Sequence, residues 1–417
     1  MSASPAAPTA ATAPPATTPP AARVADPLRL GELSVWPPVV LAPMAGVTNA
    51  PFRTLCRQHG GGLYVSEMVG ARGLVEGNHT SLWKASFAPG ESPRSIQLYT
   101  IDPDDAAAAT DLLVHPRTDD AGGKAPGPVD HVPSGAGGVD HIDLNFGCPA
   151  PKVTRHGGGS ALPWRTDLYA AIIAATVRAA GDVPVTVKLR KGIDDDHLTY
   201  LEAGRIAADL GVAAITLHGR TAQERYGPPA DWSSIARMVE AVPEVPVLGN
   251  GDIWEAADAL RMVEETGCAG VVVGRGCLGR PWLFRDLQAA FAGTPIPTPP
   301  DLGEVCDLLV SHAGLLVDAL GEYVGVRELR KHTGWYLQGF PVGGELRRTL
   351  NQVGSLDELA DRLAGLDRTV PFDEAVRRQP RGHTDRPKRP ILPYGWLDSR
   401  THGAPLPAEA AVVVSGG

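Results

Sequence analysis

Residues 245–276, VPVLGNGDIWEAADALRMVEETGCAGVVVGRG, contain two short apolar runs separated by a longer segment rich in Ala. The runs at 245–250 and 270–274 are dominated by Val, Leu and Gly, and such apolar runs are typical of strands buried on both faces. The segment between them has the apolar spacing of a helix. This stretch therefore predicts a β-α-β unit with parallel strands.

The same alternation is repeated toward the N-terminus. Six further apolar runs precede this unit, at residues 39–44, 63–67, 95–99, 141–145, 185–189 and 214–218. Eight strands over about 240 residues are typical of an α/β barrel rather than of an open sheet. After Leu283 the strand pattern stops, and the later spacing is helical. The sequence predicts a (β/α)8 TIM barrel followed by a small all-helical C-terminal domain.

Composition divides the chain into four parts. Residues 1–32 form an Ala/Pro-rich segment that we expect to be disordered, because it cannot bury enough apolar surface. The barrel is expected at 33–295, with a surface insertion rich in Gly, Pro and Asp at about 115–138. A helical domain is expected at 301–367 and a Pro-rich basic tail at 368–417.

The net charge of −9 argues at first against a nucleic-acid partner, because phosphate binding requires a basic surface. Two local stretches are basic nevertheless. Residues 326–348 hold five Arg or Lys against two Glu, and residues 377–389 hold six against one Asp. These stretches predict either solvated surface or a basic binding face.

No apolar run approaches the roughly 20 residues of a membrane helix, and no secretory signal is apparent. The five cysteines lack the C-x-x-C spacing of zinc sites and redox dithiols. We therefore expect a cytoplasmic protein without a membrane span or a metal, and we expect it to be a monomer.

Polar and reactive residues follow the predicted strands, at the barrel end where this fold carries its active sites. In chain order these are Pro43, Met44 and Ala45, then Gln97, Asn145 with Cys148, Lys188, His218, Asn250 with Gly251 and Asp252, and Gly274 with Arg275. Their convergence predicts an active site at the barrel mouth.

The residue types indicate a chemistry. Two glycine-containing loops with Arg275 predict a phosphate site, although tight turns would need glycine equally. A cation from Lys188 or His218 could stabilise an anionic reduced ring, as in a flavin. Cys148 is a candidate general acid, since a free thiol with a pKa of about 8.5 is mostly protonated near neutrality.

Nine stretches together carry a family resemblance. They are LAPMAGVT (41–48), VSEM (65–68), DLNFGCP (143–149), GGGSAL (157–162), TLHGRT (216–221), GNGDI (249–253), VGRG (273–276), GRPW (279–282) and RKH (330–332). In this ordered set the sequence resembles the tRNA-dihydrouridine synthases, especially their bacterial branch.

The resemblance implies an activity and assigns residues to it. FMN would lie over the barrel mouth, held by Pro43, Met44, Ala45, Gln97, Lys188, Asn250, Gly251, Asp252, Gly274 and Arg275, with His218 adjacent. NADPH would reduce the flavin, a hydride would pass to carbon 6 of an extruded uracil, and Cys148 would protonate carbon 5. The tRNA would contact Asn145, Arg220, Arg327, Arg330 and Lys331.

Two alternatives remain open at this point. One is an FMN-dependent TIM-barrel oxidoreductase that acts on a small pyrimidine-like molecule, since the fold hosts many chemistries. The helical domain with its basic residues disfavours it. The other is a non-catalytic tRNA-binding factor, which the presence of Cys148 and both glycine loops disfavours.

Overall fold

The computed structural model describes residues 25–115, 138–382 and 386–401. The expected insertion at 115–138 and most of the expected N-terminal tail lie outside the described residues.

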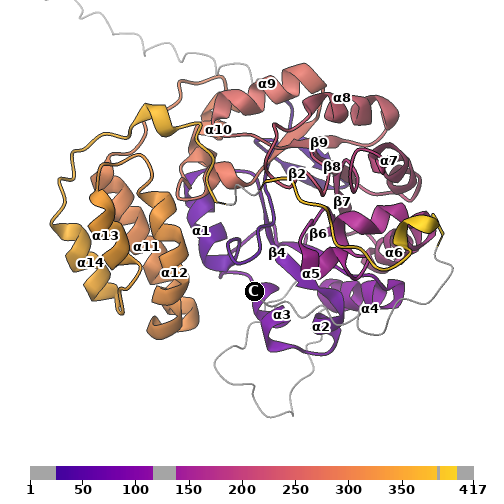
Figure 1. Ribbon diagram of the computed structural model, residues 1–417, viewed down its shortest axis with the longest axis horizontal. Helices are drawn as coiled ribbons and strands as arrows, with labels where there is room; N and C mark the ends of the chain where they lie inside the picture. Colours follow the sequence, from indigo (N-terminus) through magenta and orange to yellow (C-terminus); the bar gives the residue numbers. More distant parts are fainter. Residues whose placement is uncertain (1–24, 116–137, 383–385, 402–417) are drawn as a thin grey trace, which may run out of the picture.

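The central element is a closed barrel of eight parallel strands, in which β10 pairs with both β9 and β3. Every predicted strand is present, so the predicted barrel is confirmed (Figure 1). The strands are β3 (Val39–Leu41), β4 (Leu63–Gly70), β5 (Ser95–Tyr99), β6 (His141–Phe146), β7 (Val185–Arg190), β8 (Ala214–His218), β9 (Val247–Asn250) and β10 (Gly270–Val273).

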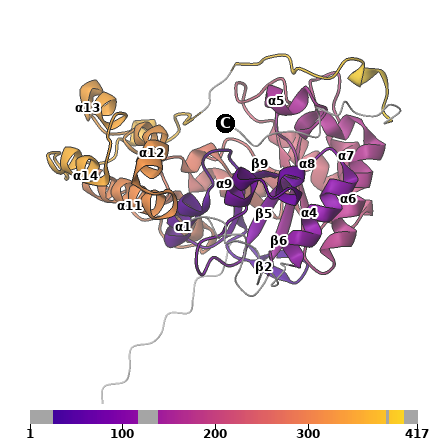
Figure 2. The same ribbon diagram turned by 90° about the horizontal axis from the view of Figure 1, so that it is seen from below.

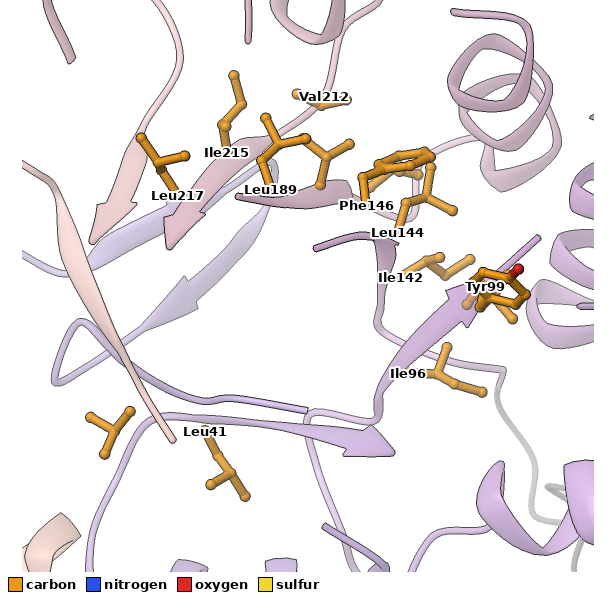
Figure 3. Packing of buried hydrophobic residues seen from close by; sticks show 14 of the residues in the cluster. Leu41, Ile96, Tyr99, Ile142, Leu144, Phe146, Leu189, Val212, Ile215 and Leu217 are labelled. Carbon is orange, nitrogen blue, oxygen red and sulfur yellow. The ribbon is translucent and has the colours of Figure 1, made fainter. Parts of the chain in front are cut away.

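Helices surround this barrel and cover its outer face. Side chains such as Leu41, Ile142, Leu189 and Leu217 lie on this outer side of the strands and are fully buried (Figure 3). Burial of each such side chain contributes about 1.5–3 kcal/mol. The helices are α1 (Ala50–His59), α2 (Ala71–Val75), α3 (His79–Lys84), α4 (Pro103–Val114), α5 (Pro151–Thr154), α6 (Thr166–Ala180), α7 (Tyr200–Asp209), α8 (Trp232–Ala241), α9 (Ala256–Thr266) and α10 (Leu283–Phe291), with the short 3-10 helices η1 (Gly159–Trp164) and η2 (Arg275–Cys277).

A hairpin that the sequence did not predict closes the N-terminal end of the barrel. Strands β1 (Leu28–Leu30) and β2 (Leu33–Val35) pair antiparallel, and their buried side chains pack against Val40 and Leu248 of the barrel. The expected start of the folded region at residue 33 is therefore too late. Each strand has only three residues, which is too short for a recognisable alternation.

The helical C-terminal region is also confirmed. It consists of α11 (Leu302–Leu320), α12 (Glu322–Tyr336), α13 (Gly343–Leu350) and α14 (Leu356–Ala364). It packs on α1, where the Phe52 ring stacks on His332 with centroids 5.9 Å apart. Figure 2 shows these helices beside the barrel. None of the described helices is both long and apolar enough to span a bilayer.

The expected C-terminal tail is partly docked. Residues 386–401, called here the C-terminal arm, run from the side of the helical domain along the barrel and end beyond α6 (Figures 1 and 2). Trp396 in η4 (Trp396–Asp398) is only 4% exposed. A Pro-rich composition predicted a loose segment, but this single buried Trp fixes the far end to the barrel.

Candidate active site

The barrel mouth contains a chain of hydrogen-bonded polar side chains. Asp143 accepts a bond of 2.7 Å from Gln97 Nε2 and one of 2.6 Å from Thr186 Oγ1. Gln97 Oε1 in turn accepts from Asn145 Nδ2 at 2.8 Å. Because alternate residues of a strand point to the same side, Asp143 and Asn145 of β6 both face the barrel interior. The network fixes the Gln97 and Asn145 amides and leaves each with one further N–H for a ligand.

Cys148 lies in a turn that Asn145 holds in place. Asn145 Oδ1 accepts from the backbone amide of Cys148 at 3.0 Å, and Ser160 donates its backbone amide and hydroxyl to the Cys148 carbonyl at 3.1 and 3.0 Å. Burial raises the pKa of the Cys148 thiol above its ordinary value, and the nearby cations Arg190 and Lys188 only partly oppose this effect. The thiol therefore keeps its proton near neutrality, as a general acid requires.

Lys188 projects from β7 into the same space. Its Nζ donates to Asn250 Oδ1 at 2.9 Å, while Asn250 Nδ2 donates to the Val272 carbonyl at 2.7 Å. Burial lowers the pKa of Lys188 to about 8, so the ammonium is mostly charged at neutral pH. Burial also raises the pKa of Asp143 to about 6. The ammonium has hydrogens to spare for an anionic ligand.

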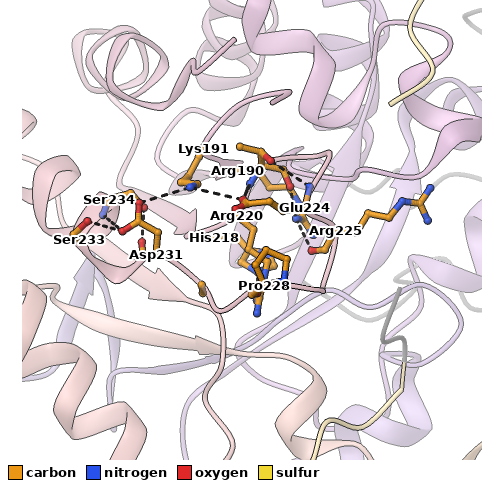
Figure 4. Close-up of polar contacts among 12 residues, drawn as sticks. Arg190, Lys191, His218, Arg220, Glu224, Arg225, Pro228, Asp231, Ser233 and Ser234 are labelled. Atoms are coloured by element: carbon orange, nitrogen blue, oxygen red, sulfur yellow. Dashed lines mark hydrogen bonds and ion pairs between the residues drawn. The ribbon is translucent and has the colours of Figure 1, made fainter. Parts of the chain in front are cut away.

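His218 is not the cation at the mouth, although the sequence left open whether Lys188 or His218 supplies it. Its Nε2 lies 3.1 Å from Arg220 Nη1, and because a guanidinium can only donate, Nε2 must be the unprotonated acceptor. Burial, together with the charges of Arg190 and Lys188, lowers the pKa of His218 well below its ordinary value. Figure 4 shows this imidazole beside Arg220. The cationic role therefore falls to Lys188.

Arg220 connects the loops that follow β8 and β9. It is 2% exposed, and its Nη2 lies 2.7 Å from each carboxylate oxygen of Asp252. Asp252 also accepts from the Ala230 amide at 2.7 Å, and its φ of 57° is unusual for a residue other than glycine. This partly buried ion pair holds the Asn250-Gly251-Asp252 backbone in a fixed, strained shape. Arg220 thus lies beneath the mouth as a positioning group.

Arg275 begins η2, directly after β10. Its side chain is 13% exposed, and its guanidinium lies 4.6 Å from the Tyr226 ring centroid, 5.1 Å from the Trp254 centroid and 3.6 Å from Asp252. The preceding Gly274 carries no side chain at the mouth. The guanidinium is therefore held in one orientation beside two backbone loops, an arrangement that suits a phosphate.

The loop Pro43-Met44-Ala45 follows β3 and completes the ring of loops around the barrel mouth. The Gly46 amide donates to Glu67 Oε2 at 2.5 Å, and Glu67 lies where the register of β4 against β5 shifts. Such a bulge re-aims side chains at the rim of a barrel. A Cβ at Gly274 would lie 3.9 Å from Met44 Sδ, so the Met44 loop and the phosphate loop are neighbours. All the predicted barrel residues are thus brought to one mouth.

This chain is similar to known proteins over most of its length. The sequence model of the dihydrouridine synthase family matches residues 40–120 and 133–370. The chain belongs to the dihydrouridine synthase family. A probable tRNA-dihydrouridine synthase of Mycobacterium tuberculosis is 51% identical over 399 residues, which cover 94% of this chain and 97% of that protein. The tRNA-dihydrouridine synthase B of Xanthomonas campestris is 38% identical over 325 residues, 78% of this chain and 91% of that protein.

As a dihydrouridine synthase, the chain is an enzyme and an oxidoreductase. The family match ends at residue 370, so it does not include the C-terminal arm. The match to the Mycobacterium tuberculosis protein covers more of this chain than the match to the Xanthomonas campestris protein.

Three of the residues that the resemblance implied for tRNA contact, Arg327, Arg330 and Lys331, lie on α12 and have different surroundings. Arg330 turns toward the α13–α14 loop, where its Nη2 donates to the Val353 carbonyl at 2.6 Å. Arg327 is exposed and stacks over the exposed Tyr323 ring at 3.6 Å. Lys331 pairs with Glu328 and lies beside the β3 loop, since a Cβ at Gly46 would be 3.6 Å from its Nζ.

Arg190 is a site residue that the sequence reading missed. It ends β7 two residues after Lys188, so its side chain lies on the same side of the strand. Its Nε donates to the Gly147 carbonyl and its Nη1 to the Thr221 carbonyl, both at 2.9 Å. Arg190 therefore links the Cys148 turn to the loop after β8. The Lys-x-Arg alternation was the signal that could have revealed it.

Proposed function

We propose that this synthase reduces the carbon 5–carbon 6 double bond of uridines in tRNA, with FMN as cofactor and NADPH as reductant, in the cytoplasm. The observation that carries the proposal is the geometry that holds the Cys148 turn, through Asn145, and the Lys188 ammonium at the same barrel mouth. Reduction of a polarised double bond by a flavin needs a proton donor and a cation that stabilises the negative charge of the reduced flavin ring. Cys148 can donate the proton, and Lys188 can supply the cation. The two relatives are named as tRNA-dihydrouridine synthases, which supports tRNA as the substrate.

The donor set of the mouth fits FMN. Free hydrogens of Gln97, Asn145 and Lys188 can meet the polar edge of the flavin ring, and Met44 offers an apolar contact. Arg275 and the glycine loops suit one terminal phosphate. When bound, FMN supplies a hydride that it has received from NADPH.

The chain's own residues account for the remaining steps. Lys188 stabilises negative charge on the ring, and Asn145 orients both the Cys148 turn and the substrate face of the site. Cys148 Sγ–H breaks as a proton passes to carbon 5 of the uracil, while carbon 6 receives the hydride. The thiolate then regains a proton from water. Arg220 and Asp252 keep the phosphate loop in place, and Arg327 and Lys331 contact the tRNA.

The test uses the purified full chain. The bound flavin is released and identified by chromatography, and the protein is incubated with NADPH and tRNA from a strain that lacks dihydrouridine. We expect FMN, and dihydrouridine that depends on NADPH and on tRNA. Recovery of FAD, or reduction of free uridine with no reaction on tRNA, would contradict the proposal and favour a small-molecule enzyme.

The basic residues of α12 give a prediction with an internal control. Replacing Arg327 and Lys331 with Ala should weaken tRNA binding and lower its log–log salt slope by about one unit for each lost phosphate contact. Arg330→Ala should instead lower thermal stability by about 1–3 kcal/mol, because it removes the donor to the carbonyl of the buried Val353. Binding titrations at several salt concentrations and thermal melts separate the two effects. An equal change of salt slope for Arg330→Ala would refute the assignment.

A further inference from the structure

The basic stretch at 377–389 divides into two groups with different surroundings. The residues of the first group, Arg377, Arg378 and Arg381, form ion pairs or hydrogen bonds within the protein. Arg378 pairs with Asp258 at 2.8 Å and with Glu255, and Arg377 pairs with Glu374. Arg381 is 1% exposed and donates to the Trp335 carbonyl at 2.6 Å. Arg378 and Arg381 thus fasten the segment before the arm to α9 and α12.

The second group, Arg386, Lys388 and Arg389, is exposed at the start of the C-terminal arm. Within the described part of the chain, no carboxylate forms an ion pair with any of the three. The sequence from 386 to 397, RPKRPILPYGWL, contains no acidic residue. On a protein of net charge −9, Arg386, Lys388 and Arg389 are a local concentration of positive charge.

The arm begins with these three cations at the rim of the barrel mouth and continues along that rim. The Lys388 amide donates to the Gln223 carbonyl at 2.8 Å, in the loop that follows β8. Farther on, Trp396 Nε1 donates to the Ala161 carbonyl at 3.1 Å, beyond the end of β6. Both contacts are at the carboxyl ends of strands, and Figure 2 shows the arm ending on the side of the barrel away from the helical domain.

The far end of the arm is anchored on the segment behind Cys148. A Cβ at Gly157 would come 2.3 Å from the Trp396 ring, so only glycine allows this packing. Arg165 lies over the same ring at 4.9 Å and donates to the Gly395 carbonyl at 3.3 Å. Because Ser160 of this segment bonds the Cys148 carbonyl, the arm has a fixed position relative to the catalytic cysteine.

The proline spacing keeps the arm extended. Prolines at 387, 390 and 393 recur every three residues, which is the period of an extended polyproline helix. That period places Lys388, Ile391 and Tyr394 on one side, and all three are exposed, Tyr394 completely. A chain stiffened by proline loses little entropy on binding. The same period places Arg386 and Arg389 on a second side, where both are exposed, so the arm displays its three cations on two sides and the Tyr394 ring beside Lys388.

We propose that the C-terminal arm is a tRNA-binding element, in which Arg386, Lys388 and Arg389 contact phosphates and Tyr394 offers a face for a base or ribose. It forms a second wall of the binding surface, across the mouth from Arg327 and Lys331. This inference rests on the proposed function for its substrate. Charge complementarity favours a polyanion, and the position at the mouth of this enzyme favours tRNA.

The test compares two triple variants of the full chain that lose the same charge. The first is Arg386→Ala with Lys388→Ala and Arg389→Ala. The control is Arg29→Ala with Arg178→Ala and Arg205→Ala. These three exposed residues lie on the β1–β2 hairpin at the opposite end of the barrel and on the outer helices α6 and α7. Affinity for tRNA is measured over a range of salt concentrations, together with dihydrouridine formation and flavin reduction by NADPH.

We expect the arm variant to bind tRNA more weakly, with a salt slope lower by up to about three units, one for each phosphate contact. Its KM for tRNA should rise, while flavin reduction and the rate at saturating tRNA stay unchanged. The control should behave like the wild type. If the wild type is active and the arm variant binds tRNA with the same affinity and salt slope as the wild type, the inference about the arm is wrong, but the proposed function stands. A wild type that binds tRNA but forms no dihydrouridine would overturn the proposed function and leave the arm's role to the binding data.

Discussion

Cys148→Ala is expected to lower dihydrouridine formation by about 10²- to 10⁴-fold, the usual range for loss of a general acid. The thiol is held at the mouth by Asn145 and Ser160, and burial keeps it protonated by raising its pKa. Flavin content and reduction by NADPH should remain near wild type, since the loops around Arg275 do not depend on this residue. Quantifying dihydrouridine by mass spectrometry after digestion of the tRNA measures the effect.

Two further variants sharpen this experiment. Cys148→Ser should restore little activity, because a hydroxyl is a much weaker acid than a thiol. Cys306→Ala removes a buried thiol from α11, in the helical domain, and should leave the rate unchanged. Normal modification by Cys148→Ala would mean that another group protonates carbon 5.

Lys188→Met should reduce turnover by about 10²- to 10³-fold, as expected when a preorganised charge at a reacting ring is lost. FMN affinity should fall as well, because a hydrogen bond from a charged group contributes about 1.5–3 kcal/mol. Both quantities can be measured on the same preparation, by fluorescence titration of the apoprotein with FMN and by stopped-flow reduction with NADPH.

The pH dependence of FMN binding provides the matching control. With a pKa of about 8, Lys188 is charged below that pH and loses its charge above it. Binding to the wild-type apoprotein should therefore weaken as the pH rises from 7 to about 9, and Lys188→Met should lack this dependence. Lys191→Met serves as control, since Lys191 faces Glu224 and Asp231 at 3.7 and 3.6 Å. A wild-type pH profile that persisted in Lys188→Met would contradict the role given to Lys188.

Most of the barrel could be predicted because each strand is an apolar run that ends in a polar or glycine-containing loop. The position of the site followed from the same pattern, since parallel strands bring their carboxyl ends together. Charge states could not be predicted in this way. His218 stays neutral because burial and the nearby charges of Arg190 and Lys188 lower its pKa, and because Arg220 donates to its Nε2.

Composition could not predict which arginines are buried and which are exposed, because this depends on tertiary contacts. Arg220 and Arg381 are buried and bonded within the protein, whereas Arg386 and Arg389 are exposed. A count of positive charge treats all four alike. The firm anchor of the arm could not be predicted for a similar reason, because it is the fit of Trp396 against Gly157, 239 positions away in the sequence.

A single-turnover experiment tests the central claim most directly. The FMN-loaded enzyme is reduced with a limiting amount of NADPH under anaerobic conditions and mixed with excess tRNA that lacks dihydrouridine. Flavin oxidation is followed by absorbance, and dihydrouridine is counted in the same samples. We predict that wild type forms as many dihydrouridines as flavins are oxidised, and that Cys148→Ala forms almost none on the same time scale. Flavin oxidation without dihydrouridine in the wild type would contradict the account.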